Sequence, residues 1–374
     1  MKIRFDKIIN ALTPYGILVL KRRYIITNIF NCFRNKFKNF HVRDNSVLVV
    51  EFYKNHGETL PGYIKYFLGL GYNIDVILNK PDRKERNDLG LFYCFRMNDK
   101  VRVKPLPTND LNLFLRSAVA FKYKHILINT FNDGMERGHL LGVNLFKLKP
   151  VCVAHNPDIN NDYFRSDKII SPVKIESISR KTPFIINPHF FGEYQKRDKS
   201  KKTTFVAFHS DSLKRRNINL LFEACDKLFE KGIIDFSVKI IRNKMKIPEK
   251  YLNNFQLFGT LDFQSMYNEI QDSDFFLALI DQASVTYTNK ASGTYQLCYG
   301  FLKPIVLHKK FSDISGLNNE NSILYSDNGD LADAMEKCIN MSGADYLSLV
   351  SALETSEKEL YDTSLNNLKK VLEI

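Results

Sequence analysis

The residue types best suited to bind an anion lie in a short loop that contains glycine. Ser292, Gly293 and Thr294 form this loop, and an apolar stretch long enough for a short helix follows it. Small side chains allow backbone N–H groups at a helix N-terminus to approach an anionic group closely. We therefore predict that this loop binds a phosphate group, with Lys290 just before it. The alternative is an ordinary capped loop.

Basic residues precede a second predicted helix, which extends from about residue 217 to residue 231. Arg215 and Arg216 follow Lys214 and stand directly before Asn217, a residue type that caps helix N-termini. A guanidinium group and the positive end of this helix would then act on the same anion. The alternative is a solvated basic turn. Arg242 and Lys244 follow a predicted strand at 236–241 and would bring further cations to the same sheet edge.

Candidate groups for proton transfer lie in the first half of the chain. His56 and Glu58 follow the first predicted strand, Asp133 lies in an Asn-Asp-Gly turn, and His155 ends another predicted strand. Histidine and carboxylate side chains are the usual general acids and bases. We expect a role for them at an acceptor or a sugar, although a lone histidine is more often a hydrogen-bonded structural residue.

The elements that must position these residues form two α/β series. Apolar stretches that predict strands alternate with helical patterns, which is typical of parallel, doubly wound sheets with right-handed crossovers. The stretch at 274–280 predicts a buried strand that leads into the Ser292 region, and ligands bind at the carboxyl ends of such strands. The predicted strands lie at 46–52, 72–78, 125–129, 150–156, 168–171 and 184–187, and then at 204–208, 236–241, 255–258, 274–280 and 304–308.

Composition excludes several classes of protein. The 374 residues are 44% hydrophobic, which excludes a disordered chain and suffices for two domains. The six cysteines are scattered singly without a Cys-x-x-Cys pair, which argues against zinc and disulfides and favours a reducing cytoplasm. The sequence contains no apolar run of membrane-spanning length and no signal-peptide pattern, so we expect the protein to stay inside the cell.

The net charge of +13 is concentrated at the start of the chain. Residues 1–40 contain nine Lys or Arg and one acid, Asp6, interleaved with apolar residues. This pattern is typical of amphipathic helices that lie on an anionic membrane surface, where each basic residue contributes about 1 kcal/mol. The alternatives are a solvated basic face and a nucleic-acid-binding segment, but the rest of the chain shows no nucleic-acid recognition motif.

Four segments, taken in order, resemble the landmarks of glycosyltransferases with the GT-B architecture. The closest class resembled is the family-4 type found in bacterial envelope polysaccharide and glycoprotein clusters, and residues 12–17 are similar to the openings of such enzymes. The four segments are His56-Gly57-Glu58 with the helix and strand that follow up to residue 76, Ser210 to Ala224, 255–261 and 274–306.

The resemblance implies a fold and an activity. The fold would be GT-B, with two Rossmann-like, doubly wound parallel-sheet domains facing a cleft. The leader would be 1–40, the acceptor domain 41–191, the linker 192–203, the nucleotide-sugar domain 204–345 and the C-terminal helices 346–374. The enzyme would move a sugar from a nucleotide-sugar donor to a saccharide acceptor carried on a lipid, without metal or cofactor, on the inner face of the cell membrane. Phe258 and Gly259 would hold the nucleobase through backbone groups, and the Ser292 loop would contact the diphosphate or the sugar.

One departure from the family pattern opens an alternative. Family members usually carry two glutamates around the Gly-rich loop, yet no Asp or Glu occurs between Asp281 and Asp313. A divergent donor site that uses hydroxyl and amide groups, a different subfamily, or a catalytically inactive glycosyltransferase-like partner subunit would each explain this absence. The donor, the acceptor and the choice between retention and inversion stay open.

Overall fold

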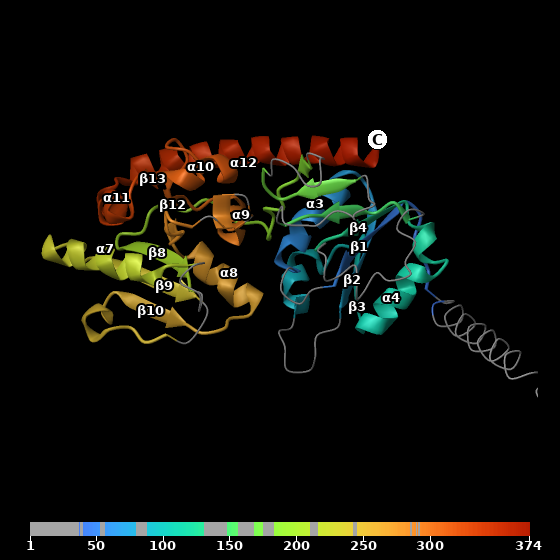
Figure 1. Cartoon of the computed structure of the whole chain (residues 1–374), viewed down its shortest axis with the longest axis horizontal. Helices are drawn as coiled ribbons and strands as arrows, with labels where there is room; N and C mark the ends of the chain where they lie inside the picture. Colours follow the sequence, from blue (N-terminus) through green and yellow to red (C-terminus); the bar gives the residue numbers. More distant parts are fainter. Residues whose placement is uncertain are drawn as a thin grey trace, which may run out of the picture.

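The chain forms two parallel sheets with helices packed against them (Figure 1). The computed structural model describes residues 37, 40–52, 57–79, 88–130, 148–155, 168–174, 183–209, 216–241, 245–284, 286–288, 290 and 292–374. Both sheets contain only parallel pairs, as the alternating pattern predicted. The predicted fold class, two Rossmann-like parallel-sheet domains, is therefore confirmed.

The first sheet has seven strands in the order β3-β2-β1-β4-β5-β6-β7. Every residue of the central strand β1 is buried, as expected for a strand covered on both faces. The sequence analysis missed β3, whose exposure alternates and which contains Pro105. Such a strand suits the edge of a sheet, where one side needs no ladder hydrogen bonds. The elements are β1 (Ser46–Glu51), η1 (Gly57–Thr59), α3 (Leu60–Gly69), β2 (Asn73–Asn79), η2 (Asp88–Phe95), β3 (Val101–Leu106), α4 (Thr108–Arg116), η3 (Ala120–Lys122), β4 (His125–Ile128), β5 (Val151–Val153), β6 (Ile169–Ser171) and β7 (Phe184–Ile185).

The second sheet has six strands in the order β10-β9-β8-β11-β12-β13, and the carboxyl ends of β8, β9 and β10 point toward the first domain (Figure 1). The predicted strand at 274–280 ends early, because Leu279 adopts a positive φ of 49° and turns the chain. The elements are β8 (Thr203–Phe208), α7 (Ile218–Glu230), β9 (Phe236–Ile241), η5 (Glu249–Tyr251), β10 (Phe255–Phe258), α8 (Phe263–Gln271), β11 (Phe275–Leu277), η6 (Thr286–Thr288), α9 (Gly293–Phe301), β12 (Ile305–His308), η7 (Lys309–Phe311), α10 (Ser312–Ser315), β13 (Ile323–Tyr325), η8 (Asn328–Asp330) and α11 (Leu331–Asn340).

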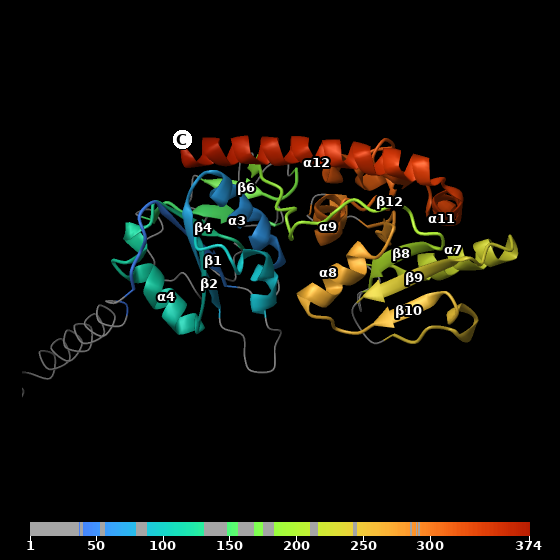
Figure 2. The ribbon, with the colours of Figure 1, turned by 180° about the vertical axis from the view of Figure 1, so that it is seen from behind.

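One long helix, α12 (Gly343–Leu372), runs along both domains (Figures 1 and 2). Near its start, the Tyr346 hydroxyl donates to the Asp274 carbonyl of the second domain at 3.2 Å. Near its end, Asn367 Nδ2 donates to the Ile185 carbonyl of the first domain at 2.9 Å. The helix therefore ties the two domains together.

Within the described part of the chain, no helix combines the length and the apolar character needed to cross a membrane.

The connecting segment at 186–194 passes between two helices that each carry a glycine at the contact. A Cβ added to Gly62 of α3 would lie 2.5 Å from the Pro188 carbonyl carbon, and one added to Gly300 of α9 would overlap the His189 carbonyl oxygen. Real Cβ atoms do not approach backbone atoms so closely, so only glycine fits at either position. These two contacts set how closely α3 and α9 approach the connector.

We predict that Gly300→Ala destabilises the protein by about 1–3 kcal/mol, because the new methyl group would overpack the contact with the connector. Gly343→Ala is the matched control, since this helical glycine has nothing within 4 Å of an added Cβ. The control should be neutral or stabilising by up to about 1 kcal/mol, as alanine is the better helix former. Urea unfolding measures both. Equal unfolding free energies for the two variants would contradict the close contact.

Candidate functional site

Arg216 links the start of α7 to the loop before α9. Its Nη2 donates to the hydroxyl oxygens of Ser292 and Thr294, each at 2.8 Å. Its guanidinium carbon lies 5.2 Å from the ring centroid of Tyr287, within the range of a cation–π contact. Three of the residues predicted from the sequence are therefore brought together at the carboxyl edge of the second sheet. Tyr287 is an addition that the sequence analysis did not find.

Asn217 fixes the position of Arg216 by capping α7, as predicted. Its Oδ1 accepts from the backbone N–H of Asn219 at 3.2 Å, and its own N–H donates to the Leu279 carbonyl at 2.8 Å. The second bond depends on the turn at Leu279, which brings the end of β11 beside the start of α7. The cap and the turn together aim the residue before the helix at the loop before α9.

Asp281 is the acid closest in sequence to this loop, and neutral donors surround it. The Ala283 N–H and the Asn217 Nδ2 each donate to its carboxylate at 2.8 Å, and the Asn328 Nδ2 donates at 3.2 Å. These hydrogen bonds, led by the one from Ala283, lower the pKa of Asp281 below its ordinary value, and the nearby His308 adds to the effect. Asp281 therefore acts as an ionised anchor of the loop at 281–284.

The start of α9 is open to solvent on one side and buried on the other. Gly293 is exposed and has nothing within 4 Å of an added Cβ, so a ligand could approach the first backbone N–H groups. Ser292, Thr294 and Gln296 are each at most 3% exposed. Gln296 Nε2 is a buried donor without a hydrogen-bond partner among the described residues. The first turn of α9 thus holds polar groups beyond those that Arg216 uses.

Phe258 and Gly259, predicted beside the nucleobase, lie at the end of the edge strand β10. Two strands, β9 and β8, separate β10 from β11, so the pair is roughly 14 Å from the Arg216 group at ordinary strand spacing. Gly259 is exposed, with open space beside it. Lys290 is half-buried. Phe258 and Gly259 therefore lie on the same edge of the sheet as Arg216 but not in contact with it.

A polar cluster in the first domain surrounds the buried carboxylate of Glu51, which ends β1 and is 2% exposed. Asn129 Nδ2 and Thr130 Oγ1 donate to Glu51 Oε2, the latter at 2.9 Å. Thr59 Oγ1 donates to Asn129 Oδ1 at 3.0 Å. The sequence analysis missed these residues, although a lone acid at the carboxyl end of an apolar strand was a usable signal.

His155, predicted as a catalytic residue, joins this cluster. Its Nε2 lies 3.2 Å from the Asn129 carbonyl oxygen. Because a carbonyl oxygen only accepts, Nε2 is the protonated donor of this hydrogen bond. Glu58, another predicted residue, directly precedes Thr59 of this cluster and is half-buried in η1.

Several predicted residues cannot be placed. His56, Asp133, Lys214, Arg215, Arg242 and Lys244 lie outside the described residues. Within the described ranges, no group of three or more His, Cys, Asp or Glu side chains has the arrangement of a metal site.

Comparison with known proteins relates the fold to enzymes of one architecture. No family model and no curated protein matches the chain. Among solved structures, TarM has a TM-score of 0.58 at 9% identity, covering 89% of this chain and 99% of TarM. A TarM point mutant from S. aureus, in complex with fondaparinux, α-GlcNAc-glycerol and UDP, has a TM-score of 0.60 at 9% identity and covers 88% of this chain and 100% of that one. AviGT4, a glycosyltransferase involved in avilamycin A biosynthesis, has a TM-score of 0.56 at 10% identity, covering 88% and 98%. Likeness at this level of identity establishes the GT-B fold.

We predict that Asp281→Asn destabilises the protein by about 1–3 kcal/mol at pH 7, because the variant loses charge-assisted hydrogen bonds. A carboxyl group with a lowered pKa stabilises the fold above its unfolded-state pKa of about 4, and this contribution is lost as the pH falls through the lowered value. The difference in unfolding free energy between wild type and variant should therefore disappear at low pH. Urea unfolding at pH 7 and pH ~2 measures it. Asp362→Asn, exposed on α12, is the charge-matched control and should show no such difference at either pH. A difference that stays constant with pH would refute the anchoring role of the charge.

Proposed function

We propose that this protein is a glycosyltransferase that moves a sugar from a nucleotide-sugar donor to a saccharide acceptor. The observation that carries the proposal is the pair of hydrogen bonds from Arg216 to Ser292 and Thr294, at the N-terminus of α9 in a GT-B fold. Transfer from a nucleotide sugar releases a nucleoside diphosphate, so the site must stabilise negative charge on the leaving group.

The donor side supplies positive charge from two sources. The guanidinium of Arg216 is held near the N-terminus of α9, where backbone N–H groups and the helix dipole favour an anion. Because hydroxyl groups hold the arginine, it is positioned before the diphosphate arrives, which lowers the reorganisation that charge stabilisation requires. We assign the diphosphate to this corner, with Gly293 allowing close approach, and the nucleobase to the end of β10.

Hydroxyl and amide groups replace the glutamates that the family pattern places around this loop. Ser292 and Thr294 provide the hydroxyls, and the buried amide of Gln296 provides an additional donor. This arrangement favours a divergent donor site over a different subfamily.

On the acceptor side, we propose His155 as the residue that removes the proton from the attacking hydroxyl. Its Nε2 is held by the Asn129 carbonyl, which fixes the ring beside the Glu51 cluster, and imidazole is a usual general base. Glu51 holds Asn129 in place, so it supports His155 indirectly. His56, Glu58 and Asp133 are retained as candidates from the sequence.

The finer assignment rests on the sequence resemblance and on the basic leader. We propose a metal-independent hexosyltransferase or related enzyme of bacterial surface polysaccharide biosynthesis, with the acceptor saccharide carried on a lipid. The enzyme would sit in the cytoplasm, peripherally on the inner face of the cell membrane through residues 1–40. The α-GlcNAc-glycerol and UDP in the complex of the TarM mutant show that a related fold holds a saccharide and a nucleotide together.

A catalytically inactive partner subunit is the second candidate. The observation that favours it is the absence of any acid between Asp281 and Asp313, together with the engagement of Asp281 by three neutral donors. Such a subunit would keep the fold and bind an active glycosyltransferase.

We predict that one class among UDP-, GDP-, dTDP- and CMP-sugars binds selectively, and that Arg216→Ala weakens this binding about 10- to 100-fold through loss of charge-assisted hydrogen bonds. Isothermal titration calorimetry measures the affinities. Arg116→Ala removes an exposed arginine at the end of α4 and should bind like the wild type. Unchanged affinity of Arg216→Ala would show that the diphosphate does not bind at Arg216. If no nucleotide sugar binds the wild type, the partner-subunit hypothesis is favoured.

We predict opposite effects of Gln296→Met on stability and on donor binding. A buried donor without a partner costs stability, so its removal should leave the unfolding free energy unchanged or raise it by up to about 1 kcal/mol. If the amide contacts the donor, affinity for the selected nucleotide sugar should fall at the same time, about 10-fold. Thermal unfolding and calorimetry on the same samples test both effects. A large loss of stability would show that Gln296 is a structural residue.

A further inference from the structure

The amino-terminal edge of the first sheet, opposite its carboxyl ends, carries an excess of positive charge. All strands of this sheet are parallel, so the segments that lead into β1 to β6 meet at one edge. The described parts of these segments contain seven basic residues and two acids, Asp44 and Asp99. The basic residues are Arg43, Arg96, Lys100, Lys122, Lys124, Lys149 and Lys168. Arg43 forms an ion pair with the buried Asp75 and Lys168 with Glu373, so the charge that faces solvent comes mainly from the other five.

Two large apolar side chains protrude from the same edge. Met97, in the turn before β3, is 98% exposed, and Phe121, in the short helix η3 before β4, is 48% exposed. Exposed basic residues flank both, with Arg96 and Lys100 beside Met97 and Lys122 beside Phe121. Apolar side chains surrounded by Lys and Arg match a bilayer surface, where apolar groups enter the interface and cations meet anionic headgroups.

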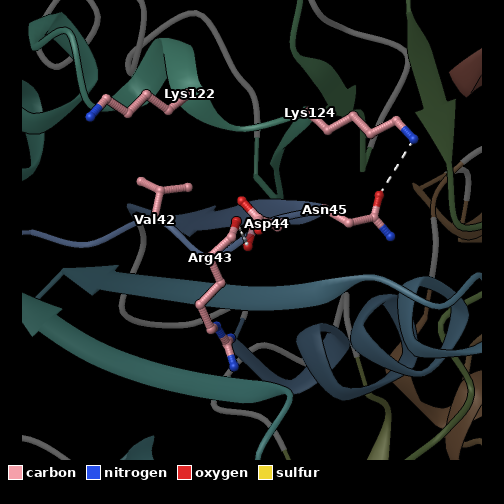
Figure 3. Close-up of a pocket in the computed structure, with 7 residues that line it drawn as sticks. Val42, Arg43, Asp44, Asn45, Lys122 and Lys124 are labelled. Carbon is pink, nitrogen blue, oxygen red and sulfur yellow. Dashed lines mark hydrogen bonds between the residues drawn. The ribbon is translucent and has the colours of Figure 1, made fainter.

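Residues 41–45, which lead into β1, lie between the turn that bears Met97 and the helix η3 that bears Phe121. Arg43 donates to the carbonyl oxygens of Asp99 and Lys100, at 2.6 and 2.8 Å, and so fixes the turn that bears Met97. On its other side the segment borders a recess of about 380 Å³ that Lys122 and Lys124 line, with Asp44 as the acid in its wall (Figure 3). Figure 3 shows both lysines across the recess from Val42, and Arg43 pointing away from them. The edge is therefore one continuous surface.

We propose that this edge, formed by residues 41–45, 96–100 and 120–124, is a docking surface for an anionic lipid bilayer. The basic leader is covalently joined to it at Phe40, so both would face the same membrane. The ring of Phe40 packs edge-on against Phe114 of α4 at 4.9 Å, which anchors the chain at this corner. The proposal does not depend on the catalytic assignment, because vesicle binding needs neither donor nor acceptor.

The first experiment uses the absence of tryptophan from the chain. Met97→Trp places a single fluorophore at the proposed contact, and Ile234→Trp places one at a 64% exposed position in the second domain. With the full-length protein and vesicles of equal parts phosphatidylcholine and phosphatidylglycerol, we expect a blue shift and quenching by brominated lipid for Trp at 97 only. No shift at 97, or equal shifts at both positions, would overturn the proposal.

The second experiment separates the edge from the leader and from general charge. Lys100→Glu/Lys122→Glu reverses two exposed charges of the edge, whereas Lys201→Glu/Lys202→Glu changes the net charge equally on the second domain. In vesicle sedimentation at low salt, the edge variant should partition about tenfold or more weakly than the control pair, which should resemble the wild type. Equal partitioning of the two variants would show that the leader alone binds the vesicles, and it would refute the proposal that the edge is a docking surface. Loss of duplex DNA binding in the edge variant, with vesicle binding retained, would replace the bilayer with nucleic acid.

Discussion

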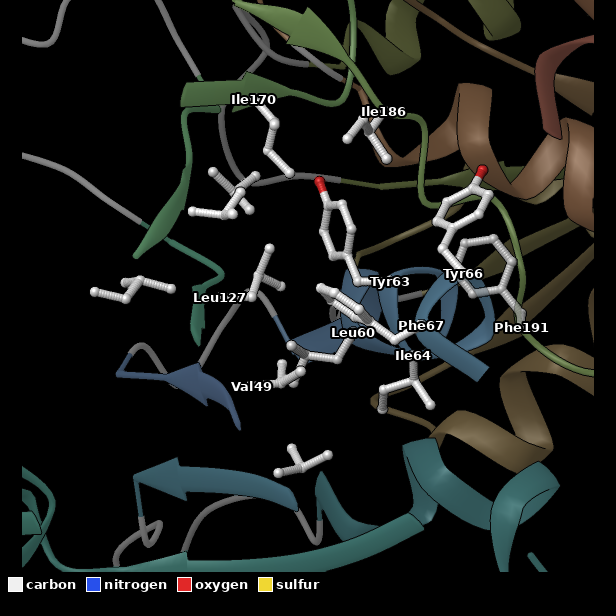
Figure 4. Packing of buried hydrophobic residues seen from close by; sticks show 14 of the residues in the cluster. Val49, Leu60, Tyr63, Ile64, Tyr66, Phe67, Leu127, Ile170, Ile186 and Phe191 are labelled. Carbon is white, nitrogen blue, oxygen red and sulfur yellow. The ribbon is translucent and has the colours of Figure 1, made fainter. Parts of the chain in front are cut away.

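The close packing of the connector against two glycines is the contact on which the arrangement of this molecule depends. The segment at 186–194 is the covalent link between the sheets, and α3 and α9 approach it at Gly62 and Gly300. Figure 4 shows Tyr63 and Tyr66 of α3 extending toward Ile186 and Phe191, so the connector completes the core of the first domain. The Tyr66 hydroxyl donates to the Asn187 carbonyl at 2.6 Å. A segment that serves as core on one side cannot also behave as a loose linker.

Helix α12 packs against the connector and α3, and it adds polar contacts to the apolar ones. Ser364 Oγ accepts from the Asn187 N–H at 3.0 Å, and the Tyr361 ring stacks on Tyr66 at 5.1 Å. The His189 ring lies between two acceptors, the Asn187 carbonyl at 3.0 Å and Glu357 Oε1 at 2.9 Å. Helix α9 carries Gly300 at its connector end and Thr294 at its other end. Any shift of the connector therefore moves, through one short rigid helix, the loop to which Arg216 is bonded.

The sequence was sufficient to predict the fold and the Arg216 corner, because both follow from local rules. Parallel strands share a carboxyl edge, so a capped helix start and a Gly-containing loop that each follow a strand were expected on the same edge, and the pairing of β8 with β11 brings them together. The Glu51 cluster needed information that a single sequence does not contain, namely that β1 and β4 are neighbours in the sheet. The edge strand β3 was missed although its apolar and charged residues alternate, because Pro105 interrupts the pattern, and the short strand β13 was missed as well. The continuity of α12 across both domains likewise depends on tertiary packing.

The two polar clusters surround groups of opposite kind, a guanidinium in the second domain and a carboxyl group in the first, with uncharged hydrogen-bond partners. Hydroxyl oxygens hold the Arg216 guanidinium in place without cancelling its charge, and the helix dipole of α9 adds to it. In the first domain, the Asn129 amide and the Thr130 hydroxyl donate to the Glu51 carboxyl group, which is 2% exposed. The missing glutamates then have a physical reading, since an acid beside Arg216 would weaken the field that a diphosphate requires.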